Sequence, residues 1–101
     1  MRGVLSLYFI QAGDCGQVKI GQTRGDVKKR LAALQTSNPE RLTVRATLHA
    51  DKDLEREIHE ALKAHRLAGE WFQPAERVVE AMRVAAGGSL SALRLCIARR
   101  K

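Results

Sequence analysis

Two short stretches near the start of the chain, Leu7-Tyr8-Phe9-Ile10 and Val18-Lys19-Ile20-Gly21, decide the fold. Both are rich in the apolar and aromatic residues that favour strands, and a glycine-containing segment separates them. Gly13-Asp14 suits a two-residue type II′ turn, because glycine accepts the backbone conformation of the first central position. The two stretches therefore predict a β-hairpin with strands over residues 4–11 and 17–22.

The apolar residues of the hairpin predict its register. If one face of the hairpin is buried, its apolar side chains must share that face. Pairing Leu7 with Ile20 meets this condition, and it places Tyr8 directly opposite Lys19. A nearby ammonium favours the phenolate, so we expect Lys19 to lower the pKa of Tyr8 from its usual value of about 10. A phenol with a lowered pKa is suited to act as a general base.

Length and charge narrow the class of protein. A chain of 101 residues is long enough for one domain with a single core. Its 18 basic and 11 acidic residues give a net charge of +7, which indicates an anionic partner, with nucleic acid as the first candidate. The excess lies in residues 1–50, with eight Lys/Arg and three Asp/Glu, and in residues 87–101, with four Lys/Arg and no acidic residue.

The remaining composition favours a reduced cytoplasmic protein. Cys15 and Cys96 lie far apart and show no metal-ligand spacing. The sequence has no signal peptide and no apolar run of membrane length, so we expect no membrane partner. We expect a protein of bacterial or phage type, and association with the nucleoid stays open.

Beyond the hairpin, the spacing of apolar residues predicts the other elements. A helical pattern predicts a first helix over residues 26–36, and strict alternation over residues 41–48 predicts a third strand with one buried face. Asp51 is suited to cap a second helix, and Pro74 to open a third after a short extended segment. Gly87-Gly88 ends that third helix, and the residues beyond it are able to form a last one.

Five pieces of the sequence occur in an order that resembles a known family. They are Ser6-Leu7-Tyr8, Lys19-Ile20-Gly21, Arg30, Leu54-Glu55 with Ile58-His59, and Gly69-Glu70-Trp71-Phe72. Over residues 4–83 the chain resembles the GIY-YIG endonuclease domain, in particular the branch similar to the protein of meiotically up-regulated gene 113, in which the second half of the motif reads Lys-Ile-Gly. The resemblance implies an α/β (α+β) fold with a small three-stranded antiparallel sheet flanked by helices. We expect this domain to span residues 1–86, followed by a basic tail over residues 87–101.

The resemblance also implies an activity, a cofactor and site residues. The activity is divalent-metal-dependent hydrolysis of DNA phosphodiester bonds, with DNA as the partner. Tyr8 would be the general base, assisted by Lys19. Arg30 would bind the scissile phosphate through its planar guanidinium. Glu55 would hold one Mg²⁺ or Mn²⁺, with water and phosphate completing the metal's shell.

Other polar residues leave alternatives open. Glu57 occupies the opposite shoulder of the same helix, and only the resemblance favours Glu55 as the metal ligand. His59 lies one turn after Glu55 and is either an accessory site residue or a boundary histidine. The exposed basic residues of the first helix and the turn before it, Arg24, Lys28 and Lys29, are candidates for DNA-phosphate contacts.

Departures from the family motif and an apolar stripe near the end of the chain leave two alternative functions open. Ser6 and Leu7 replace the first Gly and Ile of the motif, and Gln22 stands where a lysine often follows its second half. A catalytically weak or inactive DNA-binding module on the same fold is therefore one alternative. The other is a protein-interaction subunit, a homodimer or a partner complex, assembled through an apolar stripe in the C-terminal segment formed by Leu90, Leu93 and Ile97.

Overall fold

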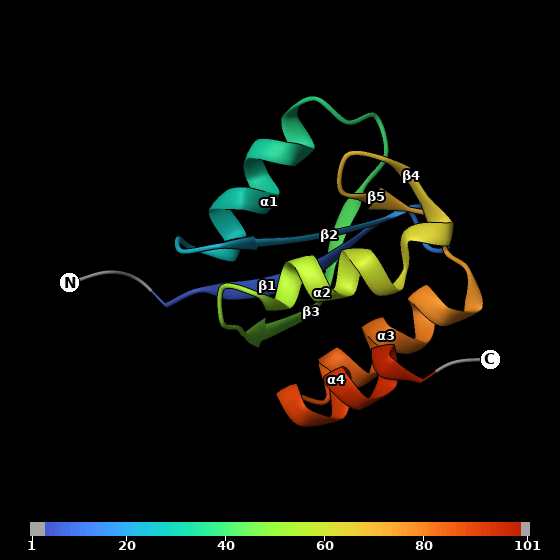
Figure 1. Ribbon diagram of the computed structural model, residues 1–101. Coiled ribbons are helices and arrows are strands. Elements are labelled where there is room, and N and C mark those ends of the chain that lie inside the picture. The colour runs from blue at the N-terminus through green and yellow to red at the C-terminus, as the bar shows by residue number, and fades with distance from the viewer. Residues whose placement is uncertain (1–3, 100–101) are drawn as a thin grey trace.

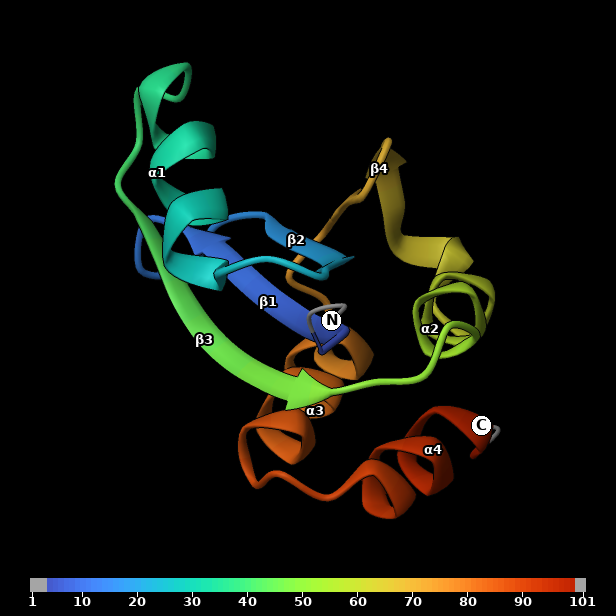
Figure 2. The ribbon, with the colours of Figure 1, turned by 90° about the vertical axis from the view of Figure 1, so that its left-hand side faces the viewer.

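One antiparallel sheet forms the centre of the protein, and helices lie on both of its sides (Figures 1 and 2). The computed structural model describes residues 4–99. The elements in chain order are β1 (Ser6–Ala12), β2 (Val18–Thr23), α1 (Val27–Thr36), β3 (Leu42–His49), α2 (Leu54–Ala61), the 3₁₀ turn η1 (Lys63–His65), β4 (Arg66–Ala68), β5 (Trp71–Phe72), α3 (Glu76–Ala86) and α4 (Leu90–Ala98).

The sheet has five strands in the order β3-β1-β2-β5-β4, rather than the three expected. The expected α+β class and antiparallel arrangement are correct. The two additional strands, β4 and β5, contain three and two residues and extend the sheet beyond β2. Strands this short carry no readable alternation, and β4 is fully exposed, so hydrophobic periodicity cannot reveal them.

The hairpin has the expected faces but a different register. Phe9 pairs with Ile20 and Tyr8 pairs with Gly21, so Tyr8 is not directly opposite Lys19. The connection between the two strands runs over residues 13–17, in which Gly13 adopts a φ of 62° and the Gly16 N–H donates to the Ala12 carbonyl. Both registers keep the apolar residues on one face, because a shift by two residues preserves the alternation. The length of the connecting loop distinguishes the two registers.

Each face of the sheet has its own apolar cluster. On one face Leu7, Phe9 and their neighbours pack against α2, α3 and α4. On the other face Tyr8 and Ile10 pack against α1, whose side chains are only partly buried. Figure 2 shows α1 on one side of the sheet and α3 and α4 on the other. The Tyr8 face is therefore the more open of the two.

A β-bulge makes β3 serve both clusters. The pairing of β1 with β3 shifts between Phe9, opposite Ala46, and Ile10, opposite Val44. Because Phe9 and Ile10 point to opposite faces, Val44 and Ala46 also do so. The prediction of one buried face along this strand is therefore wrong.

The helices follow the predicted pattern with small changes. Asp26 caps α1 by accepting from the Lys28 N–H at 2.9 Å. The N-cap position of α2 is Asp53 rather than Asp51, whose carboxylate instead accepts from the Asp53 N–H. In α4, Leu93 and Ile97 are buried in the same cluster as α2 and α3. The expected C-terminal docking stripe is therefore largely occupied by the protein's own core.

The basic end at Arg100 and Lys101 lies outside the described residues. Over residues 4–99, no helix is both long enough and apolar enough to cross a membrane.

Candidate active site

The site is built around Tyr8, which lies in the middle of the sheet and is only 1% exposed. Its partner across the hairpin is Gly21. A Cβ atom at Gly21 would lie 2.6 Å from the Tyr8 hydroxyl and 2.6 Å from Oε1 of Glu70, which is closer than Cβ contacts occur. Glycine at this position therefore lets the tyrosine hydroxyl and a carboxylate approach the same point of β2.

Arg30 reaches Tyr8 from α1. Its Nε donates a hydrogen bond to the tyrosine hydroxyl at 3.3 Å. The rest of the arginine is exposed, so its guanidinium is accessible from solvent. The structure thus joins two of the predicted site residues from different elements.

The electrostatics of Tyr8 differ from the expectation. Its pKa is raised above the usual value, chiefly because burial disfavours the charged phenolate. The hydrogen bond from Arg30 opposes this effect, while the negative charges of Glu70 and Glu55 add to it. The prediction that Lys19 lowers the pKa of Tyr8 is wrong. Lys19 lies two residues along β2 from Gly21, the residue opposite Tyr8, and its ammonium pairs with another group.

That group is Glu70, in the loop before β5. Lys19 Nζ lies 3.3 Å from Glu70 Oε1. The ammonium also lies 5.5 Å from the ring centre of Trp71. Trp71, in β5, is the residue paired with Lys19 of β2 in the sheet. Lys19 is thus a nearly buried cation with an anionic and an aromatic neighbour.

Glu55, at the start of α2, has a raised pKa of about 7. Burial is the main cause, and the neighbouring carboxyl of Glu70 raises it further, against the attraction of Lys19. Its Oε2 is buried and has no hydrogen-bond partner among the described residues. By contrast, Glu57 accepts a hydrogen bond from Arg94 at 2.8 Å. The structure therefore separates the two acids of α2, and Glu55 is the one beside Lys19 and Glu70.

His59 is held by the backbone. Its Nε2 lies 2.8 Å from the carbonyl oxygen of Ile20 and 3.9 Å from Oε2 of Glu55. Because a carbonyl only accepts, Nε2 carries the hydrogen of that bond. The ring also makes an edge contact with Phe72. These contacts favour the boundary interpretation of His59 over the accessory one.

The donor set fits a cation held by one carboxylate. In residues 4–99 no three His, Cys, Asp or Glu side chains are arranged to enclose a metal ion. Mg²⁺, however, is often bound by one or two carboxylates, with waters and substrate phosphates as its other ligands. The unpartnered oxygen of Glu55 is suited to such a site.

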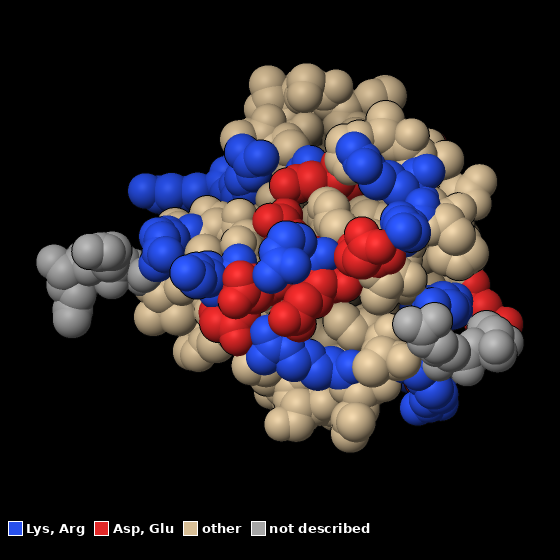
Figure 3. Space-filling view, viewed as in Figure 1, with Lys and Arg blue, Asp and Glu red and all other residues tan. Residues whose placement is uncertain are grey.

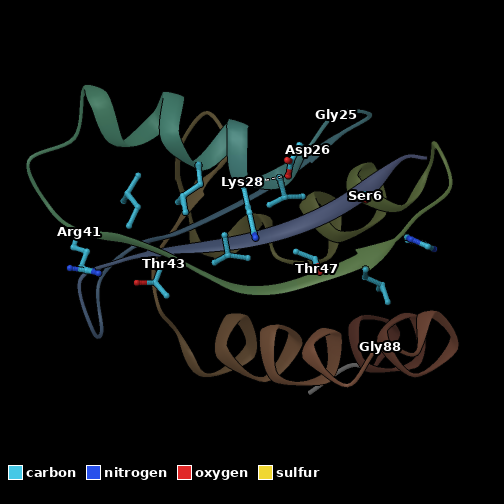
Figure 4. A pocket seen from close by; sticks show the side chains of 14 residues that line it. Ser6, Gly25, Asp26, Lys28, Arg41, Thr43, Thr47 and Gly88 are labelled. Carbon is cyan, nitrogen blue, oxygen red and sulfur yellow. Dashed lines mark hydrogen bonds between the residues drawn. The ribbon is translucent and has the colours of Figure 1, made fainter. Parts of the chain in front are cut away.

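The exposed cations do not form one cluster. At 100° per residue, Lys28 and Arg30 lie on opposite sides of α1. Lys28 points into an open groove of about 990 Å³ between α1 and β3, which Arg41 also lines (Figure 4). Tyr8, Lys19, Arg30 and Glu55 do not line this groove. Arg24 and Lys29 are exposed on the surface.

On the face that includes α2, acidic side chains gather near the centre, and basic side chains lie both among them and around them (Figure 3). The acidic residues of α2 and the turn before it are Asp51, Asp53, Glu55, Glu57 and Glu60. Four of these acids pair with basic side chains: Asp51 and Glu57 with Arg94, Asp53 with Arg56, and Glu60 with Lys63.

Glu70 was not among the residues that the sequence singled out for a role. It belongs to the Gly69-Glu70-Trp71-Phe72 piece of the family resemblance, but no role was predicted for it. A charged residue between a glycine and two apolar residues that enter the sheet was the available signal.

Fold and site together define a small α+β domain with a buried tyrosine surrounded by two cations and two carboxylates. The T5orf172 domain family matches residues 6–86. The chain belongs to this family, whose domain is found in some proteins associated with GIY-YIG and HNH-like nucleases. Searches of curated proteins and of solved structures found no match.

Proposed function

We propose that this protein is a divalent-metal-dependent DNA endonuclease of the GIY-YIG type, in the branch with a Lys-Ile-Gly motif. The observation that supports the proposal is the meeting of Tyr8, Lys19, Arg30 and Glu55. These residues come from β1, β2, α1 and α2, yet they lie around one point of the sheet. Hydrolysis of a phosphodiester needs a base, positive charge on the transition state and assistance to the leaving oxygen, and the four side chains supply these types of group.

In the proposed reaction, Arg30 binds the scissile phosphate, and Tyr8, ionised to its phenolate, accepts a proton from the attacking water. The exposed guanidinium presents its remaining N–H groups to solvent while Nε holds the tyrosine hydroxyl. This bond favours the phenolate, so the same side chain that binds the phosphate also assists the base. Lys19 adds a second positive charge near the phosphate.

Glu55 would hold the divalent cation, which supplies positive charge to the transition state and the leaving oxygen. With a pKa of about 7, the Glu55 carboxyl holds its proton more tightly than an ordinary glutamate, so the cation competes with that proton and should bind more strongly as the pH rises. The buried oxygen without a hydrogen-bond partner then gains a ligand.

The direct test is incubation of the pure protein with supercoiled plasmid, in Mn²⁺ and in EDTA. Nicking that requires Mn²⁺ and is lost in Glu55→Ala supports the endonuclease. Glu57→Ala is the matched control, because this acid lies on the same helix and binds Arg94 instead. Cleavage that is equal in EDTA, or equal in Glu55→Ala, contradicts the proposal.

A catalytically inactive DNA-binding module is the second candidate. The observation in its favour is the burial of Tyr8 together with its raised pKa, which both oppose action as a base. Gln22, the other reason for this candidate, belongs by strand alternation to the face opposite Tyr8. Retardation of plasmid in a gel without nicking, at every metal tested, would favour the binding module.

A further inference from the structure

Glu70 stands at the centre of the site although the proposed mechanism gives it no part. Its Oε1 lies 3.3 Å from Lys19 Nζ. The same oxygen lies 2.6 Å from the point that a Cβ of Gly21 would occupy, as does the hydroxyl of Tyr8. Glu70 therefore lies between Lys19 and Tyr8, and its negative charge also raises the pKa of the neighbouring Glu55.

The backbone fixes where Glu70 stands. Its carbonyl oxygen accepts a hydrogen bond from the Ile20 N–H at 3.0 Å. Ile20 lies between Lys19 and Gly21, the two residues of β2 that face the site. The next residue, Trp71, pairs with Lys19 in the sheet. Gly69, with a φ of 57°, provides the turn from β4 that brings Glu70 to this edge of β2. The local fold thus holds Glu70 against Lys19.

Lys19 needs such a neighbour. Its side chain is 10% exposed, and an ammonium so far from water is costly without a counter-charge. A lysine side chain also has four rotatable bonds and no fixed direction of its own. The carboxylate of Glu70 on one side and the ring of Trp71 on another restrict the ammonium to one position.

We propose that Glu70 is a positioning residue that holds the Lys19 ammonium beside Tyr8 for contact with the scissile phosphate. This inference rests on the proposed function. Glu70 acts through Lys19 and not directly on the substrate. Its carboxylate also balances the lysine charge in the absence of DNA, and the phosphate competes for the same ammonium when DNA binds.

A double-mutant cycle tests the inference. The variants are Glu70→Gln, Lys19→Met and the combination, with Glu80→Gln as the control, because that acid pairs with Arg83 on α3, away from the site. We expect Glu70→Gln to lower the single-turnover cleavage rate roughly tenfold, within the range for residues in contact. In the Lys19→Met background the same change should have less than about a twofold effect, since no ammonium is left to position.

Two results of the cycle would overturn the inference. One is a wild-type cleavage rate in Glu70→Gln. The other is a loss that is equally large with and without Lys19, which would show that Glu70 acts on another group, such as Glu55. Urea unfolding of each variant shows whether a lost rate reflects lost structure. If Glu70→Gln does not fold, Glu70→Asp, which keeps the charge and shortens the reach, is used in the same cycle.

A second measurement needs no nuclease activity. Acetylation of lysine amines in the free, metal-free protein, followed by mass spectrometry, reports how firmly each ammonium is held. Lys19 should react about tenfold faster in Glu70→Gln than in wild type, and Lys63 should react at the same rate in both. An unchanged Lys19 rate contradicts the positioning role. If the wild-type protein does not cleave plasmid but Lys19 reacts faster in Glu70→Gln, the proposed function is refuted and the contact between Glu70 and Lys19 still stands.

Discussion

Replacing Glu55 by glutamine should stabilise the metal-free protein at neutral and alkaline pH. The pKa of Glu55 is 4.5 in a model peptide and about 7 in the folded protein. Between these values the folded state binds more protons than the unfolded state, so the free energy of unfolding falls as pH rises from 4.5 to 7 and stays lower above 7. Glutamine has no proton to lose, and it removes this loss.

The size of the expected stability difference follows from the shift in the pKa of Glu55. A difference of about 2.5 units at 1.36 kcal/mol per unit gives an upper limit of about 3 kcal/mol. Because 22% of the side chain is exposed, solvent screens part of the cost. We therefore expect Glu55→Gln to be about 1–2 kcal/mol more stable than wild type at pH 8, and nearly equal to it at pH 4.5.

Urea unfolding in EDTA at pH 4.5, 6, 7 and 8, followed by circular dichroism, measures this difference. The comparison of wild type with variant cancels the groups that titrate equally in both, such as Asp51. Glu57→Gln is the control: it removes the negative charge that pairs with Arg94, so it should be no more stable than wild type at any of these pH values. A stability difference between Glu55→Gln and wild type that does not change with pH would refute the reasoning.

The cation provides a second arm of the same experiment. A ligand at 100 times its dissociation constant stabilises the folded state by about 2.7 kcal/mol. Mn²⁺ should therefore stabilise wild type at pH 8 and leave Glu55→Gln unchanged. Equal stabilisation of both would show that the cation binds elsewhere.

Three further predictions concern cleavage and DNA binding. Burial raises the pKa of Tyr8, Arg30 opposes that rise, and Glu70 and Glu55 add to it, so the cleavage rate should increase with pH from 7 to 9 without a plateau. Tyr8→Phe should cleave more slowly by roughly 10²–10⁴ and should lose this pH dependence. Comparable cleavage by the two proteins would exclude Tyr8 as the base. Glu55→Ala should abolish cleavage while DNA binding, measured by gel retardation, stays the same or tightens, and Glu57→Ala should cleave nearly normally. An exchange of these results would show that Glu57, and not Glu55, holds the metal. Replacing Lys28 and Lys29 by Ala should make the salt dependence of DNA binding shallower by about 0.9 log units per lost phosphate contact, and an unchanged slope would show that neither lysine touches the backbone.

Local pattern was sufficient to predict the helices and the faces of the hairpin. The apolar spacing of α1 and the alternation of β1 and β2 depend on neighbours within a few residues, and the structure agrees with both. The register does not depend on them, because Leu7 or Phe9 opposite Ile20 gives the same two faces. The bulge opposite Ile10 likewise leaves no mark on an alternation that continues through Arg45.

The site shows the same division between local and distant information. The family motif identified Tyr8, Arg30 and Glu55, which the structure brings together. It could not reveal that the partner of Lys19 is Glu70, because the two residues meet only through the pairing of β2 with β5. The direction of the Tyr8 pKa also depends on burial, which is set by the whole sheet and α1 rather than by one neighbour.

The shallow packing of α1 has a consequence for motion. No side chain of this helix is fully buried, whereas α3 buries four. Elements with few buried contacts open at a lower free energy than the whole domain, so α1 should separate from the sheet while the cluster under α3 stays folded. Arg30 would leave with the helix and uncover the hydroxyl of Tyr8. Access of water to the proposed base is then governed by the opening equilibrium of one short helix, and amide hydrogen exchange in α1 would report its frequency.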